Sequence, residues 1–563
     1  MNLANIGQSG LLAAQNRLQT TGHNITNAAT PGYSRQQVLV ETAGASASSA
    51  GWIGRGVRAV TVQRAYDAFL SSQLMQARTR GAALAAYGDQ VAQINNLVAD
   101  RSTGISPALQ QFFDGLQAVA SAPADIAARQ ELLGRADSLV SQLRQANDFL
   151  NEQRVNLNEQ VSTTVQQANS LLDRIQMLNQ KITAAGASAT GMPPNDLFDQ
   201  RDELLAGLGE LINVRVIEQD GQVSLDAGNG QLLLAGDAVF HLRATPAPAS
   251  AARLTVSVEI PDGHGGLVPL ALDETAITGG RLGGLLEFRR DVLDKTQDDL
   301  GRLAVGLAQS VNRQHAQGYD LSGQPGADIF SIGAPQARAF GGNSTNLVPA
   351  VVHEDAAGLT GSNYEVRFDG AQYTVTRQSD GIQVALIAPG DGPVSFDGLQ
   401  IDVTGLPAQA GDGWLIEPVR DAVVGLHLVL QDPAQFAAAG LGADQLPAGT
   451  ANGDNALKMA QLQLAKVIGG SGQAGPGQGS MSLNEAYARL VNTVAVKTQA
   501  NQTAIKAQDA LYQQSHAAQQ AVSGVNLDEE FILLQRFQEQ YRASARLIDA
   551  ASSMFDTLLG LRA

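Results

Sequence analysis

Apolar residues recur every seven positions at both ends of this chain, and a helix with such a stripe cannot bury it alone. The N-terminal series is Ala4, Leu11, Leu18 and Ile25, and the C-terminal series is Leu527, Leu534, Tyr541, Ile548 and Phe555. The first 40 residues contain only two charged side chains, Arg17 and Arg35. A helix surface with so few charges needs neighbours. We therefore expect the two ends to pack on each other, within one subunit or between neighbouring subunits.

The N-terminal helix is predicted to end at the sequence Ala29-Thr30-Pro31-Gly32, because proline disfavours helix in the residue before it and glycine permits a turn. Asn24 and Asn27 are suited to capping or to bonding backbone groups there, and Tyr33 is expected to pack at the exit. An ordinary helix-ending turn without a partner contact is the alternative.

Helical periodicity resumes at about residue 62 and continues to about 185, with breaks near 100 to 107 and 121 to 125. Steps of three and four residues mark a seam that packs on other helices, formed by Val161, Val165, Ala168, Leu172, Ile175 and Ile182. A second series is seven-spaced: Leu286, Leu293, Leu300 and Leu307. Helical character is expected again from about residue 420 to the end, apart from a glycine-rich linker at 469 to 479.

Two stretches show the period of two that is typical of strands. The first is a hairpin around Asp220-Gly221, flanked by Val214, Val216, Val223 and Leu225. The second spans about 345 to 420, where five Asp-Gly pairs punctuate alternating runs. Those pairs begin at Asp369, Asp380, Asp391, Asp397 and Asp412, and they predict an antiparallel β domain.

The predicted fold class is therefore mainly α with inserted antiparallel β domains, in which N- and C-terminal segments form a long helical bundle. The expected division is a terminal helical polymerisation domain of residues 1–60 with 505–563, a helical bundle domain of 61–210 with 282–320 and 421–504, a small β insertion at 211–281, and a surface-exposed antiparallel β domain at 321–420.

Composition restricts the class of protein further. A chain of 563 residues is too long for one hydrophobic core. Its net charge of −17 argues against nucleic acid or an anionic membrane as a partner. The absence of cysteine rules out disulfides, thiolate metal sites and cysteine nucleophiles. No apolar run reaches the length of a membrane span, and the N-terminal residues lack the pattern of a cleaved secretory signal.

Motifs for catalysis or metal binding are incomplete. His353-Glu354 begins like a zinc-protease motif, but Ala357 stands where the second histidine is required. Gly470, Gly472 and Gly475 match a dinucleotide-binding pattern in letters, yet they belong to the glycine-rich linker. The loop from Asp320 to Asp328 lacks the alternating oxygen ligands of a calcium loop. We expect no enzyme activity, no metal and no cofactor.

Several segments resemble a known family. HNITNAATPGYSRQ at 23–36 resembles the N-terminal signature shared by flagellar rod, hook and hook-associated proteins. The segment from Ser523 to Leu561, which begins SGVNLDEEFILLQRF, resembles the matching C-terminal signature, in particular that of the hook-associated protein 1 family. Asp67-Ala68-Phe69, PNDLFDQRDELL at 194–205 and GGLLEFRRDVL at 283–293 are similar to the same family.

The resemblance implies a nested axial-protein architecture and a structural subunit that joins the flagellar hook to the filament. It implies export without a cleaved signal through the flagellar type III system, to the extracellular flagellum. The implied partners are further copies in a helical or ring homo-oligomer, the hook protein, hook-associated protein 3, and an export chaperone bound through the C-terminal helix. The expected assembly interface comprises Leu11, Leu18, Asn24, Ile25, Asn27, Pro31, Gly32, Tyr33, Leu527, Leu534, Phe537, Tyr541, Ile548, Phe555 and Leu558.

Two other classes of function have less support in the sequence. A secreted enzyme on a flagellar scaffold lacks the motifs it would need. A carbohydrate-binding adhesin could stack sugars on Tyr364, Tyr373 and Trp414, but their places in alternating runs favour core packing.

Overall fold

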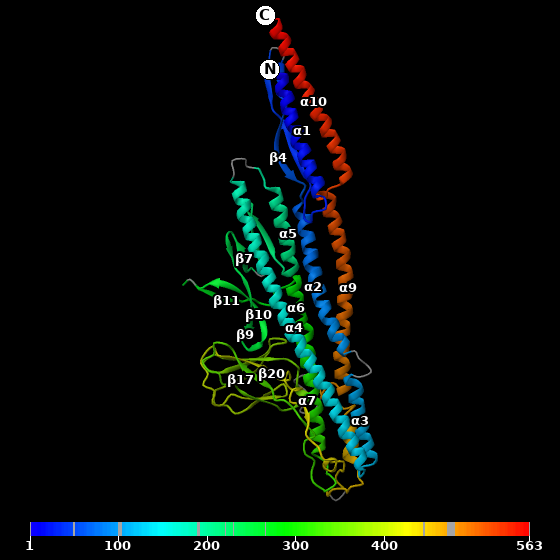
Figure 1. Ribbon diagram of the computed structural model, residues 1–563. Coiled ribbons are helices and arrows are strands. Elements are labelled where there is room, and N and C mark those ends of the chain that lie inside the picture. Colours follow the sequence, from blue (N-terminus) through cyan, green and yellow to red (C-terminus); the bar gives the residue numbers. More distant parts are fainter. Residues whose placement is uncertain are drawn as a thin grey trace.

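Helices from the two ends of the chain run side by side along one elongated body, and β sheets project from its flank (Figure 1). The computed structural model describes residues 2–48, 51–98, 104–187, 192–219, 221–228, 230–264, 266–442, 445–469 and 479–561. Its α-helices are α1 (Asn2–Asn27), α2 (Ala68–Val98), α3 (Ile105–Ser121), α4 (Ile126–Gly186), α5 (Asn195–Leu211), α6 (Gly280–Phe288), α7 (Asp294–His315), α8 (Asp454–Gln461), α9 (Leu483–Ser523) and α10 (Leu527–Gly560). A π-helical turn, Arg289–Leu293, joins α6 to α7.

The strands form small antiparallel sheets, and in each sheet the strands are named from one edge to the other. Near the termini, β1 (Gln36–Thr42) pairs with β4 (Val57–Arg64), and β2 (Ala45–Ser48) pairs with β3 (Gly51–Gly54). The small β insertion contains β5 (Arg215–Gln219), β6 (Gln222–Asp226), β7 (Leu232–Ala235) and β8 (Ala238–Val239), beside a sheet of β11 (Leu267–Ala271), β10 (Ser250–Pro261) and β9 (Leu242–Ala247). The larger β domain contains β13 (Gln336–Ala339), β20 (Gly413–Glu417), β15 (Tyr364–Phe368), β16 (Tyr373–Arg377) and β17 (Gln383–Ile387), a sheet of β14 (Ala350–His353), β19 (Leu399–Asp402) and β18 (Val394–Phe396), and the pair β12 (Phe330–Ser331) and β21 (His427–Leu428).

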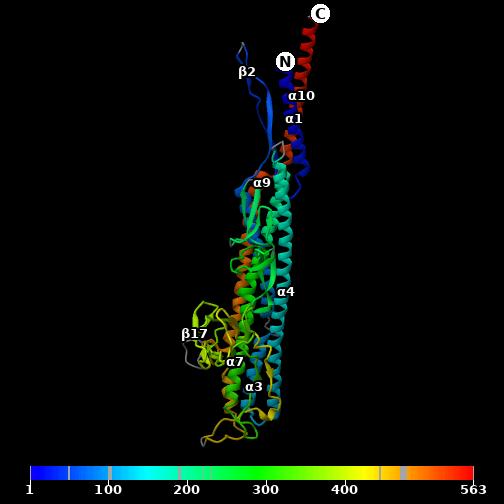
Figure 2. The ribbon, with the colours of Figure 1, turned by 90° about the vertical axis from the view of Figure 1, so that its left-hand side faces the viewer.

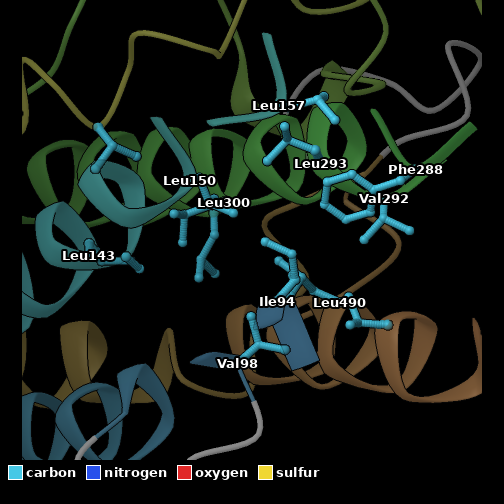
Figure 3. Packing of buried hydrophobic residues seen from close by; sticks show 14 of the residues in the cluster. Ile94, Val98, Leu143, Leu150, Leu157, Phe288, Val292, Leu293, Leu300 and Leu490 are labelled. Atoms are coloured by element: carbon cyan, nitrogen blue, oxygen red, sulfur yellow. The ribbon is translucent and has the colours of Figure 1, made fainter. Parts of the chain in front are cut away.

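The main hydrophobic core follows the long helix α4, which spans 61 residues. Asp125 caps its N-terminus by accepting a hydrogen bond from the Ala127 amide. The predicted seam from Val161 to Ile182 is buried, as is the seven-spaced leucine series of α6 and α7. Figure 3 shows Leu143, Leu150 and Leu157 of α4 among the residues of this cluster. The helical periods in the sequence therefore identified the core faces.

Nearer the termini, the seam between α2 and α9 becomes polar. Val494 of α9 is buried in the apolar core, but the next residues on the same face, at steps of seven, are Asn501, Gln508 and Ser515, which are also buried. The Asn501 amide donates to the Leu84 carbonyl at 3.0 Å, and the Gln508 amide donates to the Ala77 carbonyl at 3.0 Å. These side-chain bonds to backbone fix the register of the two helices where apolar interlocking ends.

The larger β domain has its own hydrophobic core, and aromatic residues are buried in that core. Tyr364, Tyr373 and Trp414 are at most 2% exposed, and the rings of Tyr373 and Trp414 lie 6.0 Å apart. Side chains buried in this way cannot stack on a bound sugar, so the predicted preference for core packing is confirmed. Strands β15 and β16 form the hairpin predicted at Asp369-Gly370.

The β domain is attached to the helical body by a buried charge network. Arg420, just beyond β20, lies 3.2 Å from Asp298 and 3.9 Å from Asp294, both on α7. The backbone fits equally closely there, because a Cβ added at Gly301 of α7 would lie 2.0 Å from the Val419 carbonyl oxygen. Ion pairing and close backbone contact together hold the domain against α7.

Three segments differ from the sequence-based expectations. Helix was predicted from about residue 62, with no strand before it, but Gln36–Arg64 forms two successive strand pairs and α2 begins at Ala68. Helix was expected from about 420, yet α8 begins at Asp454, because prolines and glycines interrupt the segment before it. The proposed domain boundary at 505 lies inside α9. The helical segment is interrupted instead at Gly524–Asn526, between α9 and α10.

The candidate chemical motifs have structural roles. His353 lies in a strand, and its Nε2 donates to the Pro418 carbonyl at 2.7 Å. Asp320 accepts hydrogen bonds from the Ser322 and Gln324 amides and stabilises a turn. The glycines at 470, 472 and 475, and Asp220 of the first predicted hairpin, lie outside the described residues. The strands on either side of that aspartate pair as predicted, with Gln219 opposite Gln222.

A glycine at the contact between α6 and α2 provides a test of close packing. A Cβ at Gly284 would lie 2.2 Å from the Ala83 carbonyl oxygen. Gly284→Ala should therefore lower the free energy of unfolding by about 1 to 3 kcal/mol, through overpacking against a backbone that cannot yield. Urea denaturation followed by circular dichroism measures this change.

The matched control is Gly134→Ala on α4, where an added Cβ meets nothing within 4 Å. This substitution should raise stability by roughly 0.5 to 1 kcal/mol, because alanine favours helix more than glycine does. Equal effects of the two substitutions would contradict the packing described.

A buried histidine predicts loss of stability in acid. The Nδ1 of His315 donates to the Ala327 carbonyl, its Nε2 accepts from the Ala437 amide, and burial lowers its pKa to about 4. Since this value lies below the ordinary 6.5, the stabilisation is complete above pH 6.5 and is lost as pH falls towards 4. The stability advantage of the wild type over His315→Gln should shrink by up to about 3 kcal/mol across that interval. Urea midpoints at pH 7 and pH 4.5 measure it, and a pH-independent difference would contradict the assignment.

Candidate functional site

The terminal helices α1 and α10 lie side by side and run antiparallel (Figure 1). A Cβ at Gly7 would lie 2.8 Å from Ile548 Cγ1, and one at Gly10 would lie 2.7 Å from Ser544 Oγ. Farther along α1, the Arg17 guanidinium stacks 5.3 Å from the Phe537 ring. Small residues thus let the helices approach closely, and the two stripes meet within a single chain.

This helix pair has almost no apolar core of its own. In the described part of α10, the buried side chain is that of Glu530. Of the residues predicted to form the assembly interface, those that are half-buried between the helices are Leu11, Leu18, Ile25, Leu534, Phe537 and Ile548. Those that are exposed are Leu527, Tyr541, Phe555 and Leu558. Within one chain the pair is therefore incompletely buried.

The C-terminal end of α10 extends beyond the N-terminus of α1 (Figure 1). Phe555 is 59% exposed and Leu558 is 64% exposed, and Met554, Leu559 and Leu561 beside them are exposed as well. These side chains form an exposed apolar patch at the end of α10. We call this segment, residues 554–561, the α10 overhang.

At the other end of α1, Asn24 is buried, and both its side-chain oxygen and its side-chain nitrogen form hydrogen bonds. Its Oδ1 accepts from the Gln36 amide at 2.9 Å and from the Tyr33 hydroxyl at 2.7 Å. Its Nδ2 donates to the Gln36 carbonyl at 2.9 Å and to Glu530 Oε2 at 3.1 Å. One side chain therefore ties the end of α1 to the start of β1 and to α10.

Glu530 is the centre of this junction, which we call the elbow and define by Asn24, Tyr33–Gln36, Asp196–Asp202 and Ser523–Glu530. Glu530 is 1% exposed, and its Oε1 accepts from Arg35 Nε at 2.7 Å. The Arg35 amide also donates to the Ser523 carbonyl at 2.9 Å. A buried carboxylate requires such partners, and Glu530 finds them in Asn24 and Arg35.

The N-terminal part of α5 completes the elbow. Asp199 accepts from the Ser34 amide at 2.9 Å and from Arg64 at 3.0 Å. Arg64 also donates to Asp202 at 2.7 Å and stacks 4.0 Å from the Tyr66 ring. The segment around 194–205 thus meets the N-terminal signature, which in turn meets the C-terminal signature at Glu530.

Burial and neighbouring charges shift the pKa values of two side chains in the elbow. Burial raises the pKa of the Tyr33 hydroxyl well above its usual value, and Asp196, Asp199 and Glu530 act in the same direction. Burial also raises the pKa of Asp202, although Arg64 opposes it. Tyr33 therefore stays protonated and donates its hydrogen bond to Asn24.

The predicted turn residues lie on the surface of the elbow. Asn27 donates to the His23 carbonyl at 3.0 Å, and Gly32 has a φ of 75°, which favours glycine. Pro31 and Tyr33 line an open groove of about 520 Å³ beside Glu203. Of the predicted residues, Asn24 and Tyr33 belong to the hydrogen-bonded interior, while Asn27, Pro31 and Gly32 shape its rim.

Sequence reasoning missed several residues that build this site. Arg35, Gln36, Arg64, Asp199 and Glu530 were not assigned to it, although all except Arg64 lie inside the segments that carried the resemblance. The sequence did contain one signal for them. Polar residues that lie in different segments of the family resemblance could have been predicted to contact one another. Charge periodicity alone could not have paired them.

Loss of the Asn24 amide should open the elbow. Asn24→Leu leaves backbone and carboxylate groups without partners, at a cost of about 1 to 3 kcal/mol. Hydrogen exchange should therefore accelerate roughly tenfold to hundredfold at 24–36 and 523–530, because each 1.4 kcal/mol is a factor of ten. Mass spectrometry of the purified chain measures this exchange.

The control is Asn16→Leu, at an exposed position of the same helix. It should leave exchange at the elbow unchanged. If the two variants exchanged alike at 523–530, Asn24 would not be what holds α10 to this junction.

No helix in the described part of the chain combines the length and hydropathy needed to cross a membrane. Among the same residues, no group of three or more histidine, aspartate or glutamate side chains is arranged to hold a metal ion.

Comparison with known protein families gives three matches along the chain. Residues 91–330 match the flagellar hook-associated protein FlgK helical domain, and residues 341–418 match the flagellar hook-associated protein 1 D2-like domain. Residues 518–561 match the C-terminal domain of the flagellar basal body rod FlgEFG proteins. The last match contains the break between α9 and α10 and all of α10 that the structure describes.

Individual relatives agree with these matches. The chain is 36% identical to flagellar hook-associated protein 1 of Salmonella typhimurium over 566 aligned residues, covering all of both chains. It is 34% identical to that of Escherichia coli K12 over 563 residues, again covering both fully. Among solved structures, the flagellar hook junction protein FlgK from Burkholderia pseudomallei is 28% identical with a TM-score of 0.71, covering 80% of this chain and 100% of that one.

Proposed function

The chain belongs to the flagellar hook-associated protein 1 family, and from this premise we propose that it joins the flagellar hook to the filament as an assembled adaptor. The members of this family are structural components of the flagellum, and the chain is not an enzyme. The observation that carries the finer proposal is the terminal helix pair, whose large apolar side chains are half-buried or exposed within one chain.

Assembly supplies the missing burial. A helix pair without a buried apolar core is marginal in water, and further helices packed around it would remove its exposed leucines and phenylalanines from solvent. Other copies of this chain are the first candidates for those helices, in a ring or helical homo-oligomer. The α10 overhang then enters the packing between copies.

The alternative, that both ends merely cap the helical body of a monomer, has less support. Within the part of the chain that the structure describes, no residue of α1 or α10 belongs to the main hydrophobic cluster. The pair continues beyond α2 and α9 instead of folding back on them (Figure 1). Such a position suits contacts with neighbours better than it suits capping.

The proposed neighbours along the axis are the hook protein on one side and hook-associated protein 3 on the other. An export chaperone would bind the exposed apolar face of α10 before assembly. Passage through the flagellar type III channel to the outside of the cell fits a chain without cysteine, because no disulfide can form early and hold it folded.

Charging the α10 overhang should prevent assembly without unfolding the subunit. In Phe555→Asp combined with Leu558→Asp, each carboxylate would have to be buried unpaired between copies, which costs several kcal/mol. Both positions are exposed in the single chain, so the urea midpoint of the purified subunit should not change. In cells that carry this variant as their sole copy, electron microscopy should show hooks without filaments, with flagellin released into the medium.

The matched control is Val155→Asp on α4, because Val155 is 56% exposed and lies outside the terminal pair. It should support normal filaments. Normal filaments with the double variant would refute assembly through the α10 overhang, and normal filaments after deletion of the whole protein would refute the adaptor role.

A further inference from the structure

The groove beside the elbow lies between the turn that follows α1 and the facing surfaces of α4 and α5. Its volume is about 520 Å³, and Pro31 and Tyr33 of the turn line it together with residues of both helices. Met177 of α4 also lines it and is 49% exposed. Methionine is a flexible apolar side chain that adapts to the shape of a partner. Half of this side chain is left uncovered by its own chain.

The two helical walls of the groove have opposite charges. On α4, Arg174 and Lys181 line the groove and are exposed, and in the described part of the chain neither forms an ion pair. They are seven residues apart, about 10 Å along the helix. On α5, Asp196 and Glu203 line the opposite wall. The groove therefore suits a helix that carries a carboxylate on one side, a cation on the other and apolar side chains between them.

The first turns of α10 have this combination. Phe531 and Ile532 are 57% and 65% exposed. Asp528 lies four residues before Ile532 and Arg536 lies four residues after it, so both flank it on the outward side of the helix, and both are exposed. Glu530, which meets the elbow, points to the other side of α10. This outward surface has the apolar area and the charges that the groove lacks.

The groove and this surface of α10 lie at the same level on opposite sides of the molecule. His23 lines the groove, and the next residue, Asn24, bonds Glu530 in the first turn of α10. Figure 1 shows α4 and α5 on one side of α1 and α10 on the other. Figure 2, which views the molecule from the side of α4, shows the end of α4 at the level where α1 ends. The two surfaces therefore meet only between copies that stand side by side.

We propose that the first turns of α10 of one copy lie in this groove of the next copy around the axis. Phe531 and Ile532 then cover Met177. Asp528 pairs with Arg174 on the basic wall. The contact joins two different surfaces of identical chains at one level, so it forms a closed ring where the rotation between copies closes. It rests on the proposed homo-oligomer and assigns its lateral contact, while the neighbours along the axis remain other proteins.

A chain without cysteine allows a direct test. Gln200→Cys on the groove and Gln535→Cys on α10 are placed in separate chains and expressed together in cells without the native copy; both positions are exposed. A short bismaleimide applied to isolated flagella should give a product of two chains, several-fold above the yield from either cysteine chain alone. The matched control pair is Gln535→Cys with Gln130→Cys, an exposed position near the far end of α4. Adding Arg174→Glu to the Gln200→Cys chain should reduce the yield to that of this control.

The other outcomes separate the contact from the adaptor role. Flagella with filaments but with no product above the controls would overturn the lateral contact and leave the adaptor role standing. A product that joins Gln535→Cys to a protein of another size would assign the first turns of α10 to a different partner and would also overturn it. Normal filaments in cells that lack the chain would count against the adaptor role instead.

A charge exchange keeps the test independent of crosslinking. Arg174→Glu places a carboxylate opposite Asp528 and should reduce the number of filaments per cell several-fold. Adding Asp528→Arg to the same chain should restore them, because every copy then carries both changes. Arg144→Glu, at an exposed position of α4 outside the groove, should have no effect. Filament numbers that Arg174→Glu leaves unchanged, or that the second change does not restore, would refute the contact.

Discussion

A single buried carboxylate joins the two ends of this chain. Glu530 accepts hydrogen bonds from Asn24 and Arg35, which lie 506 and 495 residues away in the sequence. The helical body and both β regions are inserted between these partners, so the elbow sets where both chain ends lie on that body. Contacts of such long range form late in folding. The terminal pair can therefore be completed after the inserted domains have formed, and α10 stays available to other molecules until then.

Burial decreases along the body from the β domains towards the termini. The centre has an apolar core along α4, and the pair of α2 and α9 relies on amide-to-carbonyl bonds from Asn501 and Gln508. The terminal pair has half-buried leucines and a buried ionic elbow. Because hydrophobic burial contributes most of the stability, local opening should become easier in the same order. The regions with least internal stabilisation are those for which we propose contacts with other copies.

Much of the fold could be predicted from periodicity, because burial repeats with the period of the local structure. The seam from Val161 to Ile182 and the hairpin at Asp369 both lie where the pattern placed them. The inner strands at 45–54 were missed because alanine, serine and glycine give little alternation, whereas the outer strands at 36–42 and 57–64 were missed although their valines alternate. The fold of 421–453 follows from packing against other elements, which no local pattern encodes.

The candidate site was predictable in its location and less so in its chemistry. Asn24 and Tyr33 were assigned from the turn, but Asn24 also bonds Glu530 of α10, and Ser34 beside Tyr33 bonds Asp199 of α5, so tertiary structure alone brings these groups together. The apolar stripe of α10 was treated as one face, yet Leu534 and Ile548 pack towards α1 while Leu527 and Phe555 remain exposed. A seven-residue repeat cannot distinguish a side chain that contacts its own chain from one that waits for another.

The course of the chain through the elbow has a mechanical consequence. It passes between the terminal pair and the body twice, once before α2 and once between α9 and α10, so an axial pull on the terminal pair reaches α2 and α9 together. These two helices run antiparallel, and the bonds of Asn501 and Gln508 lie across them. Because the pull enters both helices at the same end, it moves them together, and the bonds between them are loaded only when one helix slides past the other. An axial load on the terminal pair is therefore shared by two connections to the body.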